Sequence, residues 1–311
     1  MPRRRLSRER QIAIVALVAV AAFAAGYLVG RWRSTPAEAP ATATAPPARP
    51  GEPRTPADAE FELPPSEAPA PSVAAPAPSP PPAPAAGARV ALVIDDVGRR
   101  VEDVTELEAL KVPLSYGVLP FESRTSAVIA ELERHGAEYL CHLPMEARNG
   151  ADPGPGALTR GMSAAELDRA TRWALDAVRG ASGVNNHMGS AVMADADALE
   201  PVLKVLAERE LFFLDSRTSP DTVGYAKARE LGIPAAERKV FLDPESGAAT
   251  VREQFRRLLE ISRREGSAIA IGHPHQTTIA VLREEVPRAL EAGYEFVPVS
   301  FLVDRGGDAL R

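Results

Sequence analysis

Five short clusters of polar residues carry the side chains in this chain that could do chemistry. Each follows an apolar run, at the point where a strand should end. The clusters read VIDD at 93–96, CHLPME at 141–146, NNHMGS at 185–190, LDSRT at 214–218 and GHPH at 272–275. In parallel α/β folds the carboxyl ends of the strands share one face, so residues far apart in sequence converge there. Aspartates, histidines and a glutamate on one such face predict a metal-dependent hydrolytic site.

The adjacent carboxylates Asp95 and Asp96 are the most informative of these residues. Two carboxylates at one strand end repel each other unless a cation or a proton is shared. A solvated, turn-forming pair is the alternative interpretation. The other clusters favour the first interpretation, because they bring further metal-ligating residue types to the same face.

His142 and Glu146 stand four residues apart in the second cluster. Pro144 between them argues against a regular helix, so we expect both side chains on a loop above the strand ends. A neutral imidazole can coordinate a divalent metal, whereas a single histidine at a strand end can also be structural. The nearby aspartate pair favours the ligand role. Cys141 is expected to be a buried core residue, with a thiolate ligand as the alternative.

The third cluster is too polar for a core unless its side chains are hydrogen-bonded. His187 is expected to bind metal or substrate. The amides of Asn185 and Asn186 are expected to donate hydrogen bonds to a sugar or to an amide oxygen. A helix-capping loop is the alternative for this segment.

The last two clusters supply further candidates. Asp215 is expected to orient a catalytic histidine, and a surface pair with Arg217 is the alternative. His273 comes directly after a strand and is expected to reach the centre of the face. His275 occupies an alternate position, so we expect at most one of the two histidines at the centre and assign His275 to substrate contact.

These clusters need a scaffold of alternating strands and helices. Ser163 and Glu166 form a capping-box pattern before one of the helices. Strands are predicted at 90–94, 114–119, 138–142, 182–186, 211–214, 268–271 and 296–299, with a possible extra strand at 239–242. Helices are predicted near 102–111, 124–135, 163–179, 197–210, 222–231, 250–265 and 280–292. The pattern predicts an irregular (β/α) barrel of about seven parallel strands, with an open doubly wound sheet as the alternative.

Residues 12–30 contain no charged residue and approach the ~20 residues needed to cross a bilayer. Arginines are concentrated before this run, which predicts a cytoplasmic N-terminus and everything downstream across the membrane. A signal peptide cleaved near 22–24 is the alternative. We favour an uncleaved anchor because the apolar run continues past that point. The predicted location is the inner (cytoplasmic) membrane, as a single-pass protein with its C-terminal domain in the periplasm or otherwise outside the cytoplasm.

The composition divides the chain into four parts: a tip and anchor (1–33), a Pro/Ala-rich linker (34–87), a folded domain (88–305) and a tail (306–311). The linker has few large apolar side chains, so it cannot bury enough surface to offset its ordering entropy and is expected to be disordered. The net charge of −6 and the absence of a basic stripe with interleaved aromatic residues argue against nucleic-acid binding.

Taken in this order, the five motifs resemble those of the polysaccharide deacetylase superfamily of carbohydrate esterases, and more closely its divergent polysaccharide deacetylase subgroup. The resemblance covers about 88–303. It implies an irregular barrel of parallel strands that uses a divalent metal, usually zinc, to hydrolyse N-acetyl or O-acetyl groups on glycans. It also implies that Asp95 is the base, that Asp96 and His142 bind the metal, and that His273 is the general acid.

Two motifs depart from the family pattern. Glu146 stands where the family has a second histidine, and residues 185–187 stand where it has an arginine, a proline and a glycine. The third ligand is therefore Glu146 or His187. We favour His187, because zinc prefers imidazole to a second carboxylate, and assign Glu146 to substrate contact. The expected function is a metal-dependent hydrolase acting on acetylated envelope polysaccharide. The alternatives are a non-catalytic module that binds glycan or peptidoglycan, and an envelope scaffold that binds a protein through its Pro-rich segment.

Overall fold

Strands and helices alternate along residues 87–305, the part of the chain that the computed structural model describes. The predicted anchor, the linker up to residue 86 and the tail 306–311 lie outside the described residues. Within the described part, no helix is both long enough and apolar enough to cross a membrane.

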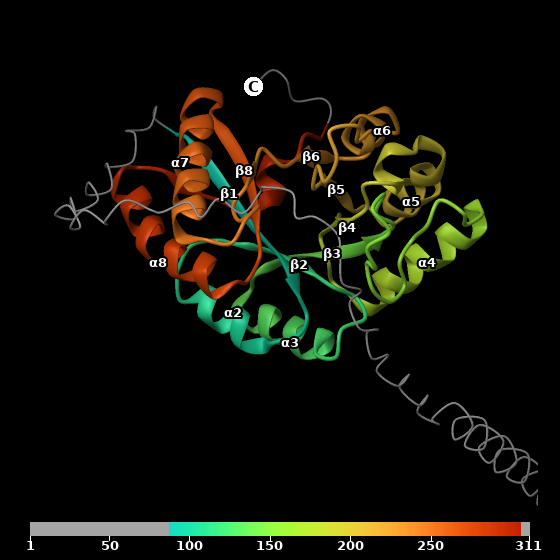
Figure 1. Cartoon of the computed structure of the whole chain (residues 1–311), viewed down its shortest axis with the longest axis horizontal. Coiled ribbons are helices and arrows are strands. Elements are labelled where there is room, and N and C mark those ends of the chain that lie inside the picture. The colour runs from blue at the N-terminus through green and yellow to red at the C-terminus, as the bar shows by residue number, and fades with distance from the viewer. Residues whose placement is uncertain (1–86, 306–311) are drawn as a thin grey trace, which may run out of the picture. The chain divides into compact units, whose positions relative to one another are not determined.

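The described strands form one parallel sheet, and the helices lie around its outside (Figure 1). The strands are β1 (Arg89–Val97), β2 (Ser115–Val118), β3 (Glu138–Met145), β4 (Gly183–Met188), β5 (Phe212–Asp215), β6 (Ala235–Glu237), β7 (Val240–Phe241), β8 (Ser267–Gly272) and β9 (Glu295–Phe296). The helices are α2 (Val101–Glu108), α3 (Thr125–His135), α4 (Ala164–Ala177), α5 (Ala196–Glu208), α6 (Gly224–Glu230), α7 (Ala248–Glu265) and α8 (Gln276–Glu291). Across the sheet the order is β6-β5-β4-β3-β2-β1-β8-β7, and β9 pairs with β1.

One segment of the chain, residues 235–241, joins the two ends of this sheet. Its first half, β6, pairs with β5, and its second half, β7, pairs with β8. Only Arg238 and Lys239 separate the halves. The Arg238 amide donates to the carbonyl of Asp215 (3.0 Å), and the Lys239 amide donates to that of Ile269 (2.9 Å). The sheet therefore closes through this two-residue seam, which gives the irregular parallel barrel that the sequence predicted.

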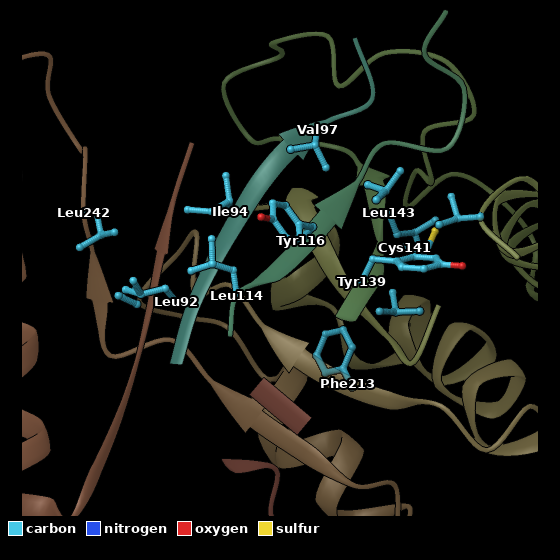
Figure 2. Packing of buried hydrophobic residues seen from close by; sticks show 14 of the residues in the cluster. Leu92, Ile94, Val97, Leu114, Tyr116, Tyr139, Cys141, Leu143, Phe213 and Leu242 are labelled. Atoms are coloured by element: carbon cyan, nitrogen blue, oxygen red, sulfur yellow. The ribbon is translucent and has the colours of Figure 1, made fainter. Parts of the chain in front are cut away.

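Alternate residues along each strand face opposite sides of the sheet. One side packs against the helices, and Figure 2 shows part of this cluster, including Leu92, Ile94, Tyr116, Cys141 and Leu143. The other side fills the barrel interior with Ala91, Val93, Leu140, Leu214 and Ile271. The same alternation continues into the polar residues at the strand ends, so it decides which of them face the interior. Cys141 faces the helices and is a buried core residue, as expected.

The predicted helices are all present, with ends within a few residues of the predicted ones. The capping box is also confirmed, because the Ser163 amide donates to Glu166 Oε2 (2.8 Å) and the Glu166 amide donates to Ser163 Oγ (3.4 Å). Strand β7 confirms the possible extra strand, whereas β6 was not predicted. The last predicted strand is shorter than expected, because a 3₁₀-helix over Val299–Leu302 follows β9.

Three strands extend further than the sequence predicted. β1, β3 and β4 continue into their polar clusters, so His142 lies within β3 and not on a loop. The loop prediction rested on Pro144, which breaks helices but is tolerated in a strand where no neighbour needs its missing amide. β2 ends opposite Cys141, so the stretch of β3 around Pro144 has no neighbouring strand on that side.

Candidate metal and catalytic site

Three ligand atoms from three strands of the sheet meet at the carboxyl end of the barrel. They belong to Asp96 of β1, His142 of β3 and His187 of β4. Asp96 Oδ1 lies 3.2 Å from His142 Nε2 and 2.9 Å from His187 Nδ1. The two imidazole nitrogens are 3.1 Å apart. We call these three residues the trio.

The trio fits a divalent metal. Ligand atoms that each lie about 2.0–2.1 Å from a tetrahedral zinc ion are separated by about 3.3 Å, close to the spacings found here. Asp96 Oδ1 is also buried, and apart from His142 and His187 no described residue offers it a hydrogen bond. Burial raises the pKa of Asp96, but His142 and His187 outweigh it and hold the pKa well below its ordinary value. The carboxylate is therefore ionised and free to accept a cation.

A break in the regular strand brings both aspartates to one site. In a regular strand, adjacent side chains point to opposite faces. Asp96 has a φ of 60°, and the pairing of β1 with β2 shifts register between Ile94 and Val97. This irregularity turns Asp96 towards the side that Asp95 already faces, so His142 Nε2 lies 3.6 Å from Asp95 Oδ2 as well as close to Asp96.

Asp95 is held beneath the trio by an amide. Its side chain is buried, and Asn185 Nδ2 donates to both carboxylate oxygens, at 2.8 and 2.9 Å. Asn185 Oδ1 in turn lies 3.0 Å from His142 Nδ1, which leaves His142 Nε2 facing Asp96. Burial raises the pKa of Asp95, and this effect exceeds the opposing influence of His142, His273 and Asn185.

Gly117 provides the space for the Asp95 carboxylate. A Cβ atom at this position would lie 2.1 Å from Asp95 Oδ1 and 3.3 Å from Asn185 Oδ1. No side chain larger than hydrogen fits between β2 and the carboxylate without a shift. The glycine is therefore required by the close approach of Asp95 and not by its backbone angle.

A histidine–aspartate pair faces the trio from the ends of β8 and β7, which follow β1 in the sheet order. His273 Nδ1 lies 3.0 Å from Asp243 Oδ1, and its backbone amide donates to Asp243 Oδ2 (2.8 Å). Thr278 Oγ1 also donates to Asp243 Oδ2 (2.8 Å). His273 Nε2 is thereby directed to the trio, 3.8 Å from Asp96 Oδ2. Burial alone would lower the pKa of His273. The hydrogen bond to Asp243 and the charges of Asp243, Asp96 and Asp95 outweigh burial and raise this pKa to about 9.

These groups line a cavity of about 390 Å³, a size that suits a small ligand. Its wall also includes Ser216, Arg217, Arg238 and Phe241. Three residues near the ends of β1, β4 and β5 have positive φ angles: Asp96 (60°), Met188 (52°) and Arg217 (49°). Strained backbone of this kind is concentrated at functional sites, where the surrounding structure holds it in place.

A family model described as divergent polysaccharide deacetylase matches residues 92–303. The chain belongs to the divergent polysaccharide deacetylase family. It is 38% identical over 198 residues to an uncharacterized protein of Haemophilus influenzae, covering 64% of this chain and 71% of that protein. It is 36% identical over 198 residues to the uncharacterized protein YibQ of Escherichia coli, covering 64% of this chain and 62% of YibQ.

A solved structure shares the fold. The crystal structure of the uncharacterized protein ATU2773 from Agrobacterium tumefaciens C58 matches with a TM-score of 0.64 and 28% identity, covering 70% of this chain and 90% of that chain. The family match confirms the resemblance drawn from the five motifs.

Asp215 does not orient a histidine in this divergent polysaccharide deacetylase. It follows Leu214, which faces the barrel interior, so its own side chain faces the helices. Asp215 Oδ1 accepts from the Arg217 amide (2.8 Å), and Oδ2 accepts from Thr222 Oγ1 (2.7 Å) and the Tyr225 amide (3.1 Å). The carboxylate therefore fixes the segment between β5 and α6. The predicted orienting role belongs to Asp243.

The predicted substrate contacts of Asn185 and Asn186 are replaced by protein contacts. Asn185 binds Asp95 and His142, as described above. Asn186 Nδ2 donates to the Met188 carbonyl (2.8 Å), and Asn186 Oδ1 accepts from the Ser216 amide (2.9 Å). Both amides therefore hold the site together and are not free for a sugar.

The other two residues assigned to substrate contact, Glu146 and His275, lie away from the trio. Glu146 Oε2 accepts from the Arg160 amide (2.8 Å), so this carboxylate fixes the loop after β3. Between the two candidates for the third ligand, the geometry groups His187 and not Glu146 with Asp96. His275 is exposed, with its ring centroid 5.6 Å from that of His273, and does not line the cavity.

Sequence reasoning missed Asp243, Gly117 and Arg238. Asp243 directly follows the possible extra strand at 239–242, so it had the same signal as the other candidates: an acidic residue after an apolar run. Gly117 and Arg238 had no such signal, because their importance depends on which strands become neighbours.

Proposed function

We propose that this protein is a metal-dependent deacetylase that acts on an acetylated polysaccharide of the cell envelope. The arrangement of the trio carries the proposal: three ligand atoms lie 2.9–3.2 Å apart, with a buried carboxylate on one side and a histidine–aspartate pair on the other. This arrangement supplies a cation site, a base and an acid. Such groups are required to hydrolyse an amide or ester.

A divalent metal, which we propose to be zinc, would be held by Asp96, His142 and His187 and would polarise the acetyl carbonyl. Asp95 takes a proton from the attacking water, and its raised pKa makes it a stronger base than an ordinary carboxylate. Asn185 keeps both carboxylate oxygens in place during this transfer. Asn185 stands in the segment where the family pattern has an arginine, and it gives the base a neutral amide as its partner.

His273 completes the reaction. With a pKa of about 9, its imidazole is protonated near neutral pH and can donate a proton from Nε2 to the leaving group. For an N-acetyl group the products are acetate and an amine. For an O-acetyl group they are acetate and an alcohol. Asp243 fixes the ring through Nδ1 and stabilises its charge, so that the proton leaves from the nitrogen facing the trio.

We further propose that the enzyme works at the outer side of the inner membrane. The uncharged run at 12–30 would anchor it, and the Pro/Ala-rich linker would let the domain reach a glycan away from the bilayer. Fractionation of cells that express the full chain tests this setting. Recovery in the cytosolic fraction would refute it.

The function is tested by measuring acetate release from acetylated glycans by the zinc-loaded protein and its Asp95→Asn variant. We expect the variant to lose about 10²–10⁴-fold in rate while retaining its metal, because only the base is removed. Acetate release that is unchanged in Asp95→Asn would refute the assignment of the base. The absence of acetate release by metal-loaded wild type from N- and O-acetylated glycans would instead favour a glycan-binding module on this fold.

A further inference from the structure

Arg238 is a fixed cation in the wall of the cavity that holds the trio. It lies on the seam that closes the barrel. Its Nε donates to the Ser216 carbonyl (2.6 Å), and its Nη2 donates to the Arg217 carbonyl (2.8 Å). The guanidinium lies over the Phe241 ring, 5.0 Å from its centroid. These contacts hold the planar group in one orientation before any ligand arrives.

Arg238 forms no direct ion pair in the described part of the chain: no carboxylate oxygen there lies within 4.0 Å of its guanidinium, and Asp215 and Asp95 act on its charge only from farther away. Its two cationic neighbours differ in this respect. Arg217 pairs with Glu237 Oε2 (2.6 Å), and Lys239 pairs with Glu237 Oε1 (2.9 Å). No described residue accepts from Arg238 Nη1, whereas Nε and Nη2 are bound to carbonyls. A half-buried cation without a direct ion pair gains stability when a ligand brings a carboxylate into contact with it.

We propose that Arg238 binds a carboxylate of the substrate, so that the enzyme prefers an acetylated glycan whose sugars carry acid groups, such as a uronic acid or a lactyl ether. This inference rests on the proposed function of the same cavity. The guanidinium is the side chain best suited to a carboxylate, because its donors form a rigid fork. Since Arg238 and the trio line one cavity of about 390 Å³, the acid and acetyl groups lie on the same sugar or on adjacent ones.

The test uses direct binding, which does not depend on turnover. Isothermal titration calorimetry of the full chain compares unacetylated trigalacturonate with its methyl ester, which has the same sugars without the charges. We expect wild type to bind the acid at least about tenfold more tightly than the ester, as a desolvated ion pair with arginine allows. Arg238→Gln should bind the two equally, and Arg238→Lys should fall between. Lys239→Gln is the matched control and should behave as wild type, because Lys239 is paired with Glu237 and does not line the cavity.

Two outcomes would overturn the proposal. One is equal binding of the acid and the ester by wild type, which requires no variant and therefore no assumption about folding. The other is a loss in Arg238→Gln of the turnover number for neutral and acidic substrates alike, with acid binding unchanged, which would assign Arg238 to the reacting carbonyl. A protein that releases no acetate but binds the acid through Arg238 would refute the proposed function and leave this inference standing.

Discussion

Replacing Gly117 by alanine tests whether the position of the Asp95 carboxylate determines activity. The new Cβ would lie 2.1 Å from Asp95 Oδ1, whereas ordinary contacts begin at 3.4 Å, so the carboxylate must move by about 1.3 Å. A shift of this size breaks at least one of the two hydrogen bonds from Asn185, which are 2.8 and 2.9 Å long. Misplacement of a reacting group by ~1 Å costs about 10²-fold in rate. Overpacking also costs about 1–3 kcal/mol of stability.

The assay is the steady-state rate of acetate release, measured together with zinc content and thermal unfolding. Gly161→Ala is the matched control, because no atom lies within 4 Å of its added Cβ and its backbone angle does not require glycine. We expect Gly117→Ala to lose about 10²-fold in turnover number with its metal retained, and Gly161→Ala to lose none. The loss should not exceed that of Asp95→Asn, which removes the base altogether.

The reasoning would be refuted by a folded, zinc-loaded Gly117→Ala variant with wild-type turnover. In that case the Asp95 carboxylate could move by more than 1 Å without effect, and it could not be the base. Loss of zinc from Gly117→Ala would also contradict the argument, because none of the trio atoms is among the three nearest neighbours of the added Cβ.

Three further predictions follow from the contacts around the site. Asp243→Asn should shift the alkaline limit of activity to lower pH. Activity is lost as pH rises through the pKa of His273, and the Asp243 carboxylate helps to raise that pKa to about 9. An unchanged pH profile of turnover would contradict this prediction. His142→Ala and His187→Ala should each lose bound zinc in metal analysis, and full retention by either would remove that residue from the ligand set. Asp215→Asn should lower the free energy of unfolding by about 1–3 kcal/mol in urea, because three hydrogen bonds are weakened, with little change in turnover.

Much of the fold could be predicted because the strands and helices have strong local signals. Apolar runs, capping residues and terminal glycines place the elements to within a few residues. No comparable local signal marks β6, a three-residue strand without an alternating pattern. Its partner is decided by barrel closure, which depends on segments far apart along the chain.

The candidate site, like the fold, could be predicted only in part. Asp95, Asp96, His142, His187 and His273 come together as the strand-end argument requires. Asp215 also ends an apolar run, but its side chain faces the helices and not the site. Its strand carries apolar residues on both faces, so position after the strand does not reveal the direction of the side chain. Counting from the residues that fill the barrel interior would have given that direction, but those residues are known only once the barrel is closed.

The seam between β6 and β7 also sets a distance. Arg238 and Asp243 lie on or just after the segment that closes the barrel, whereas Asp96, His142 and His187 come from β1, β3 and β4. The length of this link therefore determines how far the cationic and acidic groups of one wall stand from the trio. Insertion or deletion of a single residue between Glu237 and Val240 would alter that spacing while leaving the ligands untouched.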